Sequence, residues 1–213
     1  MRPFEAAVVG IGVPFLLVLL LEWSLGTRRQ QPPWVVFLAG GATAFVALLA
    51  EQYVWRKFNW RLPPDWASVI RAFLMVALVE ELVKLALIRG QAAQHRYDDF
   101  RDFAVMAATI GAGFAAAENL LYAARIPPDA MPLRLFTAAP MHIATAIIAA
   151  RLIWLGMVLD EPVLLLAAVG AATLLHGAYD FLAMAEHPIE HHIWALLGLI
   201  LGLAISTLGK QRA

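Results

Sequence analysis

Long apolar stretches recur along the chain, and short polar segments rich in turn-forming residues separate them. Each stretch has the length of about 20 residues that an α-helix needs to cross ~30 Å of hydrocarbon. The strict alternation of polar and apolar residues that is typical of a membrane β-barrel is missing. We therefore expect seven transmembrane helices, at residues 6–25, 34–54, 67–89, 101–124, 134–158, 162–185 and 191–208.

Composition supports a protein that lies within a membrane. Of the 213 residues, 62% are hydrophobic and only 15% are charged, and a soluble domain would need more polar sequence for its surface. The 16 basic and 16 acidic residues balance, so no net charge indicates a nucleic-acid partner. The absence of cysteine excludes disulfides and thiol catalysis. We expect an all-α polytopic membrane protein that forms one transmembrane helical domain over residues 1–213, surrounded by lipid.

The distribution of basic residues predicts an orientation. The side shared by the first, third and fifth loops and the C-terminus carries more Lys and Arg than the other side. The positive-inside rule then places the N-terminus outside and the C-terminus inside the plasma membrane. The loop at residues 95–102 is the most strongly charged connection, and we expect it beside the functional site because it joins two helices that carry polar motifs.

Four segments place acids, imidazoles or amides where hydrocarbon is expected. An ionisable side chain at the centre of a spanning helix costs about 2.5–3.5 kcal/mol on insertion scales, so such residues are expected to pair, to bind a ligand or to do chemistry. The segments are residues 79–84, 114–119, 141–142 and 175–180. They predict a site within the bilayer, in a core that covers about residues 67–185.

The first segment carries two adjacent glutamates and a lysine. Glu80 and Glu81 precede Lys84 by four and three residues, so the ammonium can reach either carboxylate on one face of a helix. One carboxylate is then left without a cation, and such a group can serve as a general base or acid. The alternative is a structural ion pair that fixes helix packing.

The second segment contains a buried acid without a cation on its own helix. Phe114, Glu118 and Tyr122 form one helical stripe, while Asn119 is turned about 100° away. Glu118 is expected to be protonated, to bind a group on another helix or to coordinate a metal. Asn119 can donate a hydrogen bond to a developing oxyanion. Arg134, at the start of the next span, can reach a lipid phosphate or a substrate carboxylate.

Two histidines and an aspartate complete the candidate set. His142 follows a proline, and its structural alternative is a hydrogen bond to a freed backbone carbonyl. His176 and Asp180 are four residues apart, so they can bond each other or share a ligand. With Glu118 they offer ligands for a Zn²⁺ ion. The same groups can instead orient water for a glutamate base, and the sequence leaves both mechanisms open.

The ordered motifs resemble those of the PrsW family of intramembrane proteases, which is related to the CAAX prenyl endopeptidases. The resemblance covers about residues 79–180 and implies a prokaryotic plasma-membrane protease that cuts membrane-embedded or membrane-proximal protein segments. Its prototype activity is the cleavage of an anti-sigma factor. The CAAX endopeptidases carry a histidine where this chain has Glu118. The motifs are Glu80-Glu81-x-x-Lys84, Phe114-x-x-x-Glu118-Asn119-x-x-Tyr122, Arg134 with Pro140-x-His142-x-x-Thr145, and His176-Gly177-x-x-Asp180.

The mechanism that we predict is peptide hydrolysis by activated water. Glu80, assisted by Glu81 and held by Lys84, removes a proton from the water. His142 and His176 position that water for attack on a peptide carbonyl.

The other polar groups support this reaction. Asn119 or a metal ion stabilises the oxyanion, and Glu118 and Asp180 orient the histidines or complete a zinc site. Two other functions stay open. The first is a proton-coupled transporter or ion pathway, because such proteins also carry buried carboxylates and histidines on several helices. The second is a catalytically silent scaffold that binds single-span membrane proteins.

Overall fold

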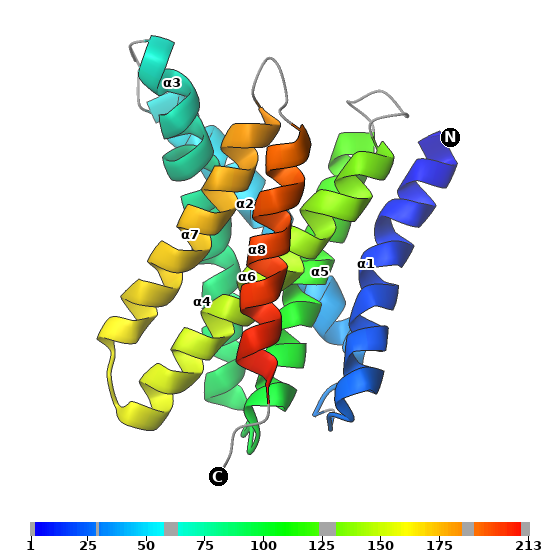
Figure 1. The fold of residues 1–213 in the computed structure, drawn as a ribbon, viewed down its shortest axis with the longest axis vertical. Coiled ribbons are helices and arrows are strands. Elements are labelled where there is room, and N and C mark those ends of the chain that lie inside the picture. Colours follow the sequence, from blue (N-terminus) through cyan, green and yellow to red (C-terminus); the bar gives the residue numbers. More distant parts are fainter. Residues whose placement is uncertain (1–2, 29, 58–63, 124–130, 185–189, 210–213) are drawn as a thin grey trace.

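The computed structural model is a bundle of helices that run roughly along one common direction (Figure 1). It describes residues 3–28, 30–57, 64–123, 131–184 and 190–209. No strand occurs in these residues, and the all-α class expected from the sequence is confirmed. The elements are α1 (Pro3–Leu25), α2 (Pro33–Lys57), α3 (Pro64–Ile70), the π-helical segment η1 (Arg71–Ala77), α4 (Leu78–Gln94), α5 (Phe100–Ala123), α6 (Met131–Leu159), α7 (Val163–Ala183) and α8 (Glu190–Leu208).

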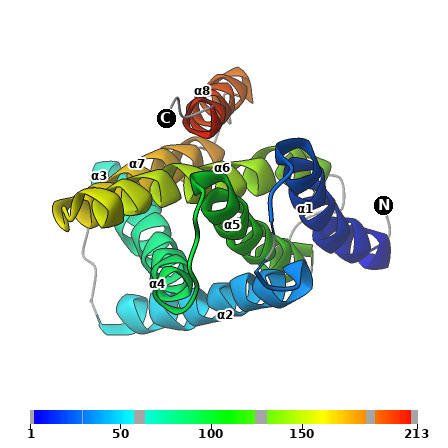
Figure 2. The ribbon, with the colours of Figure 1, turned by 90° about the horizontal axis from the view of Figure 1, so that it is seen from below.

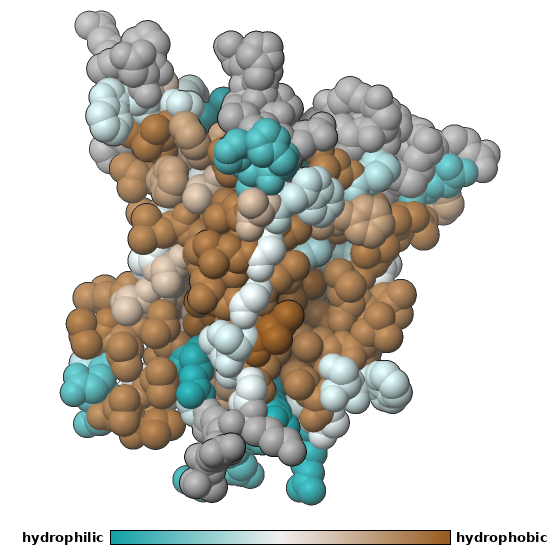
Figure 3. Space-filling view, in the orientation of Figure 1, coloured by the Kyte–Doolittle hydropathy of each residue, from teal (hydrophilic) through white to brown (hydrophobic). Residues whose placement is uncertain are grey.

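Six helices in the described part of the chain are long and apolar enough to cross a membrane, namely α1, α2, α5, α6, α7 and α8. Many large apolar side chains on them are exposed, and Figure 3 shows hydrophobic residues covering most of the middle of one face, with hydrophilic residues towards the ends. In water such a surface would be unstable, whereas lipid solvates it. The chain is therefore an integral multi-pass membrane protein.

The third expected span, residues 67–89, falls on three consecutive elements. α3, η1 and α4 follow one another without a break from Pro64 to Gln94. α3 and η1 have 7 residues each and α4 has 17, so none of the three is by itself long enough to count among the six apolar helices. They nevertheless run alongside those helices in Figure 1. With this composite segment included, α1 begins at one end of the bundle and α8 ends at the other. The last residues of two expected spans, Ala124 and Ala185, lie outside the described residues.

The π-helical segment directly precedes the first polar motif. Its wider turns are closed by bonds such as that from the Leu78 N–H to the Phe73 carbonyl. The Phe73 ring packs against Gly177 of α7, where an added Cβ would lie only 2.5 Å from the ring. π-Helical turns are rare and occur frequently at functional sites. Here the segment sets the direction in which the side chains at the start of α4 point.

Close approach of backbones places α5 at the centre of the bundle. α5 contacts α1, α2 and α6, and Figure 2 shows it enclosed by its neighbours. A Cβ added to Gly113 would collide with the Phe37 carbonyl of α2, and one on Gly111 would lie 2.5 Å from the His142 carbonyl of α6. Small residues permit this proximity between membrane helices. The result is that α5 and α6 bring their polar side chains within reach of each other.

The charged loop between α4 and α5 lies far from the polar motifs. Glu80 precedes the end of α4 by about 21 Å of helix, and Glu118 follows the start of α5 by about 27 Å, at 1.5 Å per residue. Figure 1 shows the two helices joined at the end of the bundle opposite to α3. The expectation that this loop sits beside the site was wrong, because a loop between two antiparallel helices can be distant from motifs near their other ends.

The close packing of α2 on α5 can be tested at Gly113. We expect Gly113→Ala to destabilise the protein by about 1–3 kcal/mol, as overpacking of a filled core does. Thermal unfolding in detergent would report a lower Tm. Gly198→Ala is the matched control, since no atom lies within 4 Å of its added Cβ. An unchanged Tm for Gly113→Ala would show that the two backbones can separate at no cost.

Candidate active site

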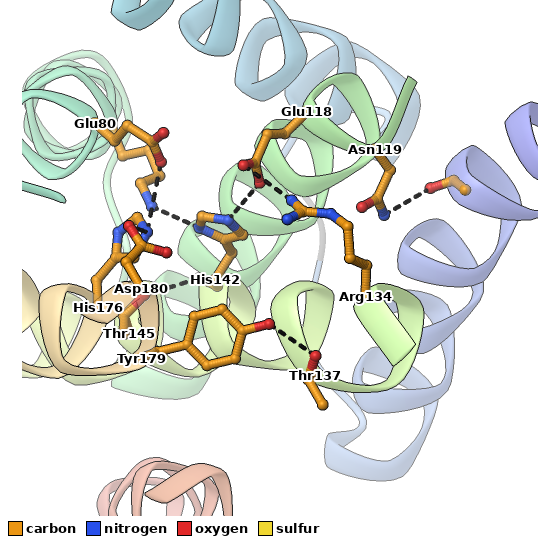
Figure 4. A network of polar contacts seen from close by, with 12 residues as sticks. Glu80, Glu118, Asn119, Arg134, Thr137, His142, Thr145, His176, Tyr179 and Asp180 are labelled. Atoms are coloured by element: carbon orange, nitrogen blue, oxygen red, sulfur yellow. Dashed lines mark hydrogen bonds and ion pairs between the residues drawn. The ribbon is translucent and has the colours of Figure 1, made fainter. Parts of the chain in front are cut away.

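The polar residues of four helices converge in one buried cluster. α4, α5, α6 and α7 each contribute side chains that point towards one another (Figure 4). The exposed fractions of Glu81, Lys84, His142 and His176 are 1, 0, 1 and 2%. Because these groups lie inside a bundle of apolar helices, their mutual contacts must replace the water that they have lost.

The Lys84 ammonium is held between an acid and an imidazole. It donates to Glu81 Oε1 at 2.6 Å and lies 3.0 Å from His142 Nδ1. The face of the Phe114 ring covers it, with the ring centre 4.5 Å from Nζ. Of the two glutamates, it is Glu81 that Lys84 pairs with, so the mechanism in which Lys84 holds Glu80 does not agree with the geometry.

His176 connects the two adjacent glutamates. Its Nδ1 lies 2.8 Å from Glu81 Oε1, the oxygen that also accepts from Lys84. Its Nε2 faces Glu80 Oε2 at 3.7 Å and Asp180 Oδ2 at 3.3 Å. Within the described residues, these last two oxygens are buried and make no hydrogen bond. Buried polar atoms in proteins are nearly always satisfied, so this is a place for a water molecule or an ion.

Glu118 binds groups on another helix, which is one of the three possibilities expected for it from the sequence. Its Oε1 lies 3.0 Å from an Arg134 guanidinium nitrogen, and its Oε2 lies 2.9 Å from His142 Nε2. The guanidinium also stacks on the Tyr122 ring, 3.6 Å from the ring centre. Arg134 thus has a partner inside the protein, and both nitrogens of His142 are engaged.

Asn119 points away from the histidines. Its amide nitrogen donates to the Gly10 carbonyl of α1 at 3.4 Å, and Figure 4 shows the side chain directed towards that helix. The donor that would stabilise an oxyanion is therefore used in packing α1 against α5. This geometry indicates a structural role for Asn119.

Hydroxyl groups support the cluster, and those of Thr137 and Tyr179 were not expected from the sequence to do so. The Tyr179 and Thr137 hydroxyls lie 2.7 Å apart and join α7 to α6. Thr145 donates to the His142 carbonyl at 3.2 Å, within α6. The available signal for Tyr179 was its position directly before Asp180 in a polar motif.

A fifth acid adjoins the cluster from α2. The Glu51 carboxyl lies against that of Glu80, close enough for a hydrogen bond between them when one carries a proton. No role was expected for Glu51 from the sequence. The signal was present, because an acid inside the expected span 34–54 bears the same insertion cost as the acids of the motifs.

One group of side chains can hold a metal ion. Ligand atoms of Glu80, His142 and His176 lie within 4.8 Å of one another in the described part of the chain. Two imidazoles and a carboxylate form a donor set that zinc hydrolases use, and the unpaired Glu80 Oε2 is the buried atom that an ion would satisfy. His142 would exchange one of its two hydrogen bonds for the ion. The set expected from the sequence contained Glu118 and Asp180, whereas here Glu80 joins the two histidines.

The buried Lys84–Glu81 pair gives a prediction for stability. Lys84→Met leaves the Glu81 carboxylate buried without its cation, and breaking such a pair costs about 3–5 kcal/mol. The double variant Lys84→Met/Glu81→Gln removes both charges and is expected to be more stable than the single variant. Thermal unfolding of both variants in detergent measures the difference. A single variant as stable as wild type would mean that Lys84 and Glu81 do not form a charged pair in the folded protein.

Comparison with known proteins gives a family. The family model described as PrsW family intramembrane metalloprotease matches residues 31–207. Protease PrsW of Oceanobacillus iheyensis is 27% identical over 120 residues, which cover 54% of each chain, about half the length of that relative. Protease PrsW of Bacillus subtilis is 24% identical over 196 residues, which cover 84% of each chain. No solved structure matches.

The matched region includes every polar motif of the buried cluster. It also includes seven of the nine elements in full, from α2 to α7, together with most of α8. This match confirms the family resemblance inferred from the motifs. It also confirms the expected enzyme class, a protease. The chain belongs to the PrsW family of intramembrane metalloproteases.

Proposed function

We propose that this chain is an endopeptidase that hydrolyses peptide bonds of membrane-embedded or membrane-proximal protein segments with an activated water molecule. One observation carries the proposal, namely the meeting of Glu80, Glu81, His142 and His176 in one buried place between four helices. A set of this kind is costly in a membrane unless it binds or reacts, and the family supplies the reaction class.

The contacts distinguish the roles of the two adjacent glutamates. Glu81 Oε1 accepts from both Lys84 and His176, so its charge is balanced and it acts as a positioning residue. Glu80 Oε2 has no hydrogen bond among the described residues and lies 3.7 Å from His176 Nε2, so this oxygen is left to accept a hydrogen bond from water. Glu80 is therefore the general base that removes a proton from the attacking water.

The histidines complete the proton path. His176 is oriented by Glu81 on one nitrogen and faces Asp180 with the other, so it can pass a proton to the leaving amine. His142 is fixed between Lys84 and Glu118. The Lys84 ammonium, rather than Asn119, supplies positive charge beside the developing oxyanion.

A metal ion also fits this site, and with the ion bound Glu80 would be one of its ligands instead of the free base. Glu80, His142 and His176 would hold a zinc ion, which polarises a carbonyl and acidifies a bound water when present. Glu118, which pairs with Arg134, fixes the ring of His142. Asp180 fixes the ring of His176, so both imidazoles would be oriented for the ion.

The substrate follows from the family resemblance and the topology. We propose a single-span membrane protein of the anti-sigma-factor type. The enzyme would lie in the plasma membrane with its N-terminus outside. In that orientation the end of the bundle that carries α3 (Figure 1) faces the outer side of the membrane. The site lies towards that end, because Glu80 is near the start of α4 and Glu118 and His176 are near the ends of α5 and α7.

The assignment of the base is tested with Glu80→Gln. This variant keeps the size of the side chain and removes its basicity, so kcat/KM should fall at least about 100-fold, the usual contribution of a general base. Cleavage of a single-span reporter in proteoliposomes measures the effect, and Glu161→Gln in an exposed turn is the control. Full cleavage by Glu80→Gln would exclude this base. Ion flux without proteolysis in the same vesicles would favour a transporter.

The metal is tested on the purified protein. We expect about one zinc per chain, held by a histidine–carboxylate donor set. A chelator should remove zinc and activity together, and added zinc should restore both. His142→Ala should lower the zinc content measured by elemental analysis, while His192→Ala, on the exposed surface of α8, should not. Full activity of zinc-free enzyme would contradict the metal site and leave the glutamate and histidine mechanism.

A further inference from the structure

A cavity of about 540 Å³ lies between the C-terminal part of α2 and η1. Its lining includes Glu51, Trp55 and Arg56 of α2 and Arg71, Met75 and Val76 of η1. We call this cavity the α2–η1 groove. Its volume falls in the range of about 300–1,000 Å³ that is usual for ligand clefts, and it is independent of the residues that the family motifs contain.

The groove adjoins the buried cluster at one end. Glu51 lines the groove and its carboxyl lies against that of Glu80. A chain segment that occupies the groove would therefore bring its backbone next to the glutamate that activates water. Trp55, Met75 and Val76 offer apolar walls for its side chains, as extended-peptide sites do.

The lining of the groove also carries two cations. Arg56 and Arg71 are exposed, and in the described part of the chain neither of them makes an ion pair. Guanidinium groups bind carboxylates in bidentate geometry. Two unpaired arginines at the edge of an apolar cavity thus complement an acidic side chain.

The separation of Glu51 and Arg56 along α2 indicates where that acidic side chain lies. Arg56 follows Glu51 by five residues, which is about 7.5 Å along the helix. An extended chain covers this distance with about two residues at 3.3 Å each. The acidic residue is therefore two to three residues from the bond that lies beside Glu80.

We propose that the α2–η1 groove holds an extended segment of the substrate next to its scissile bond, and that Arg56 and Arg71 bind an acidic side chain two to three residues from that bond. This inference rests on the proposed function, because it takes the cluster as the place of cleavage. It adds a specificity that the proposed function does not contain.

A charge swap tests the selectivity. In a single-span reporter, Asp or Lys is placed at each of the six positions on either side of the scissile bond. Wild type should cleave the reporter with Asp at the second or third position about tenfold or more faster in kcat/KM than the one with Lys, as expected for a charge-assisted hydrogen bond. Arg56→Glu/Arg71→Glu should reverse this preference. Lys57→Glu, next to Arg56 but outside the groove lining, should leave it unchanged.

Photo-crosslinking tests occupancy without cleavage. A benzoylphenylalanine at Val76 should capture the Asp-bearing reporter, and one at Ile205, which is 67% exposed on α8, should not. If the reporter crosslinks at Val76 but wild type does not cleave it, the proposed function is rejected, while the α2–η1 groove is still supported as a binding site for an extended segment. Cleavage that ignores the position of Asp, equal crosslinking at both sites, or capture of phospholipid alone would overturn the inference.

Discussion

The structure depends on the burial of one ammonium group in an apolar bundle. Lys84 is fully buried, and its charge is tolerated because Glu81 and His142 lie within hydrogen-bond distance of it. Removing either partner would leave a charge in a medium of low polarity, where the effective penalty is several kcal/mol. Since the two partners come from different helices, α4 and α6 must pack in one relative position. His176 extends this constraint to α7 through its contact with Glu81, and Glu118 extends it to α5.

The backbone packing makes this polar arrangement possible. Glycines on α5 allow α2 and α6 to approach it closely, and the Phe73 ring of η1 occupies the space that Gly177 leaves on α7. These contacts are apolar and without chemistry of their own, yet they hold η1 and the start of α4 in place. The polar contacts then select one arrangement among those that apolar packing alone would permit, a role for which buried polar groups are well suited.

Much of the fold could be predicted from hydropathy. For the site, the sequence predicted which residues take part but not which of them contact one another. Spans of apolar residues predict helices because lipid forces the backbone to satisfy itself, and six of the seven expected spans were found as apolar helices. The choice of Glu81 over Glu80 by Lys84 was beyond the sequence, since spacings of three and four are equally good on a helix. The π-helical turns before Glu80 have no sequence signature. Asn119 and Arg134 meet partners on other helices, Gly10 of α1 and Glu118 of α5, and such pairings depend on how helices pack.

The count of charges in and around the cluster has a thermodynamic consequence. Within the described residues, five carboxyl groups, those of Glu51, Glu80, Glu81, Glu118 and Asp180, face the ammonium of Lys84 and the guanidinium of Arg134. A medium of low dielectric constant does not tolerate the excess of anions. Folding must therefore be accompanied by the uptake of protons or of a metal cation from the surroundings, so that the stability of the bundle and the electroneutrality of its interior form one linked equilibrium.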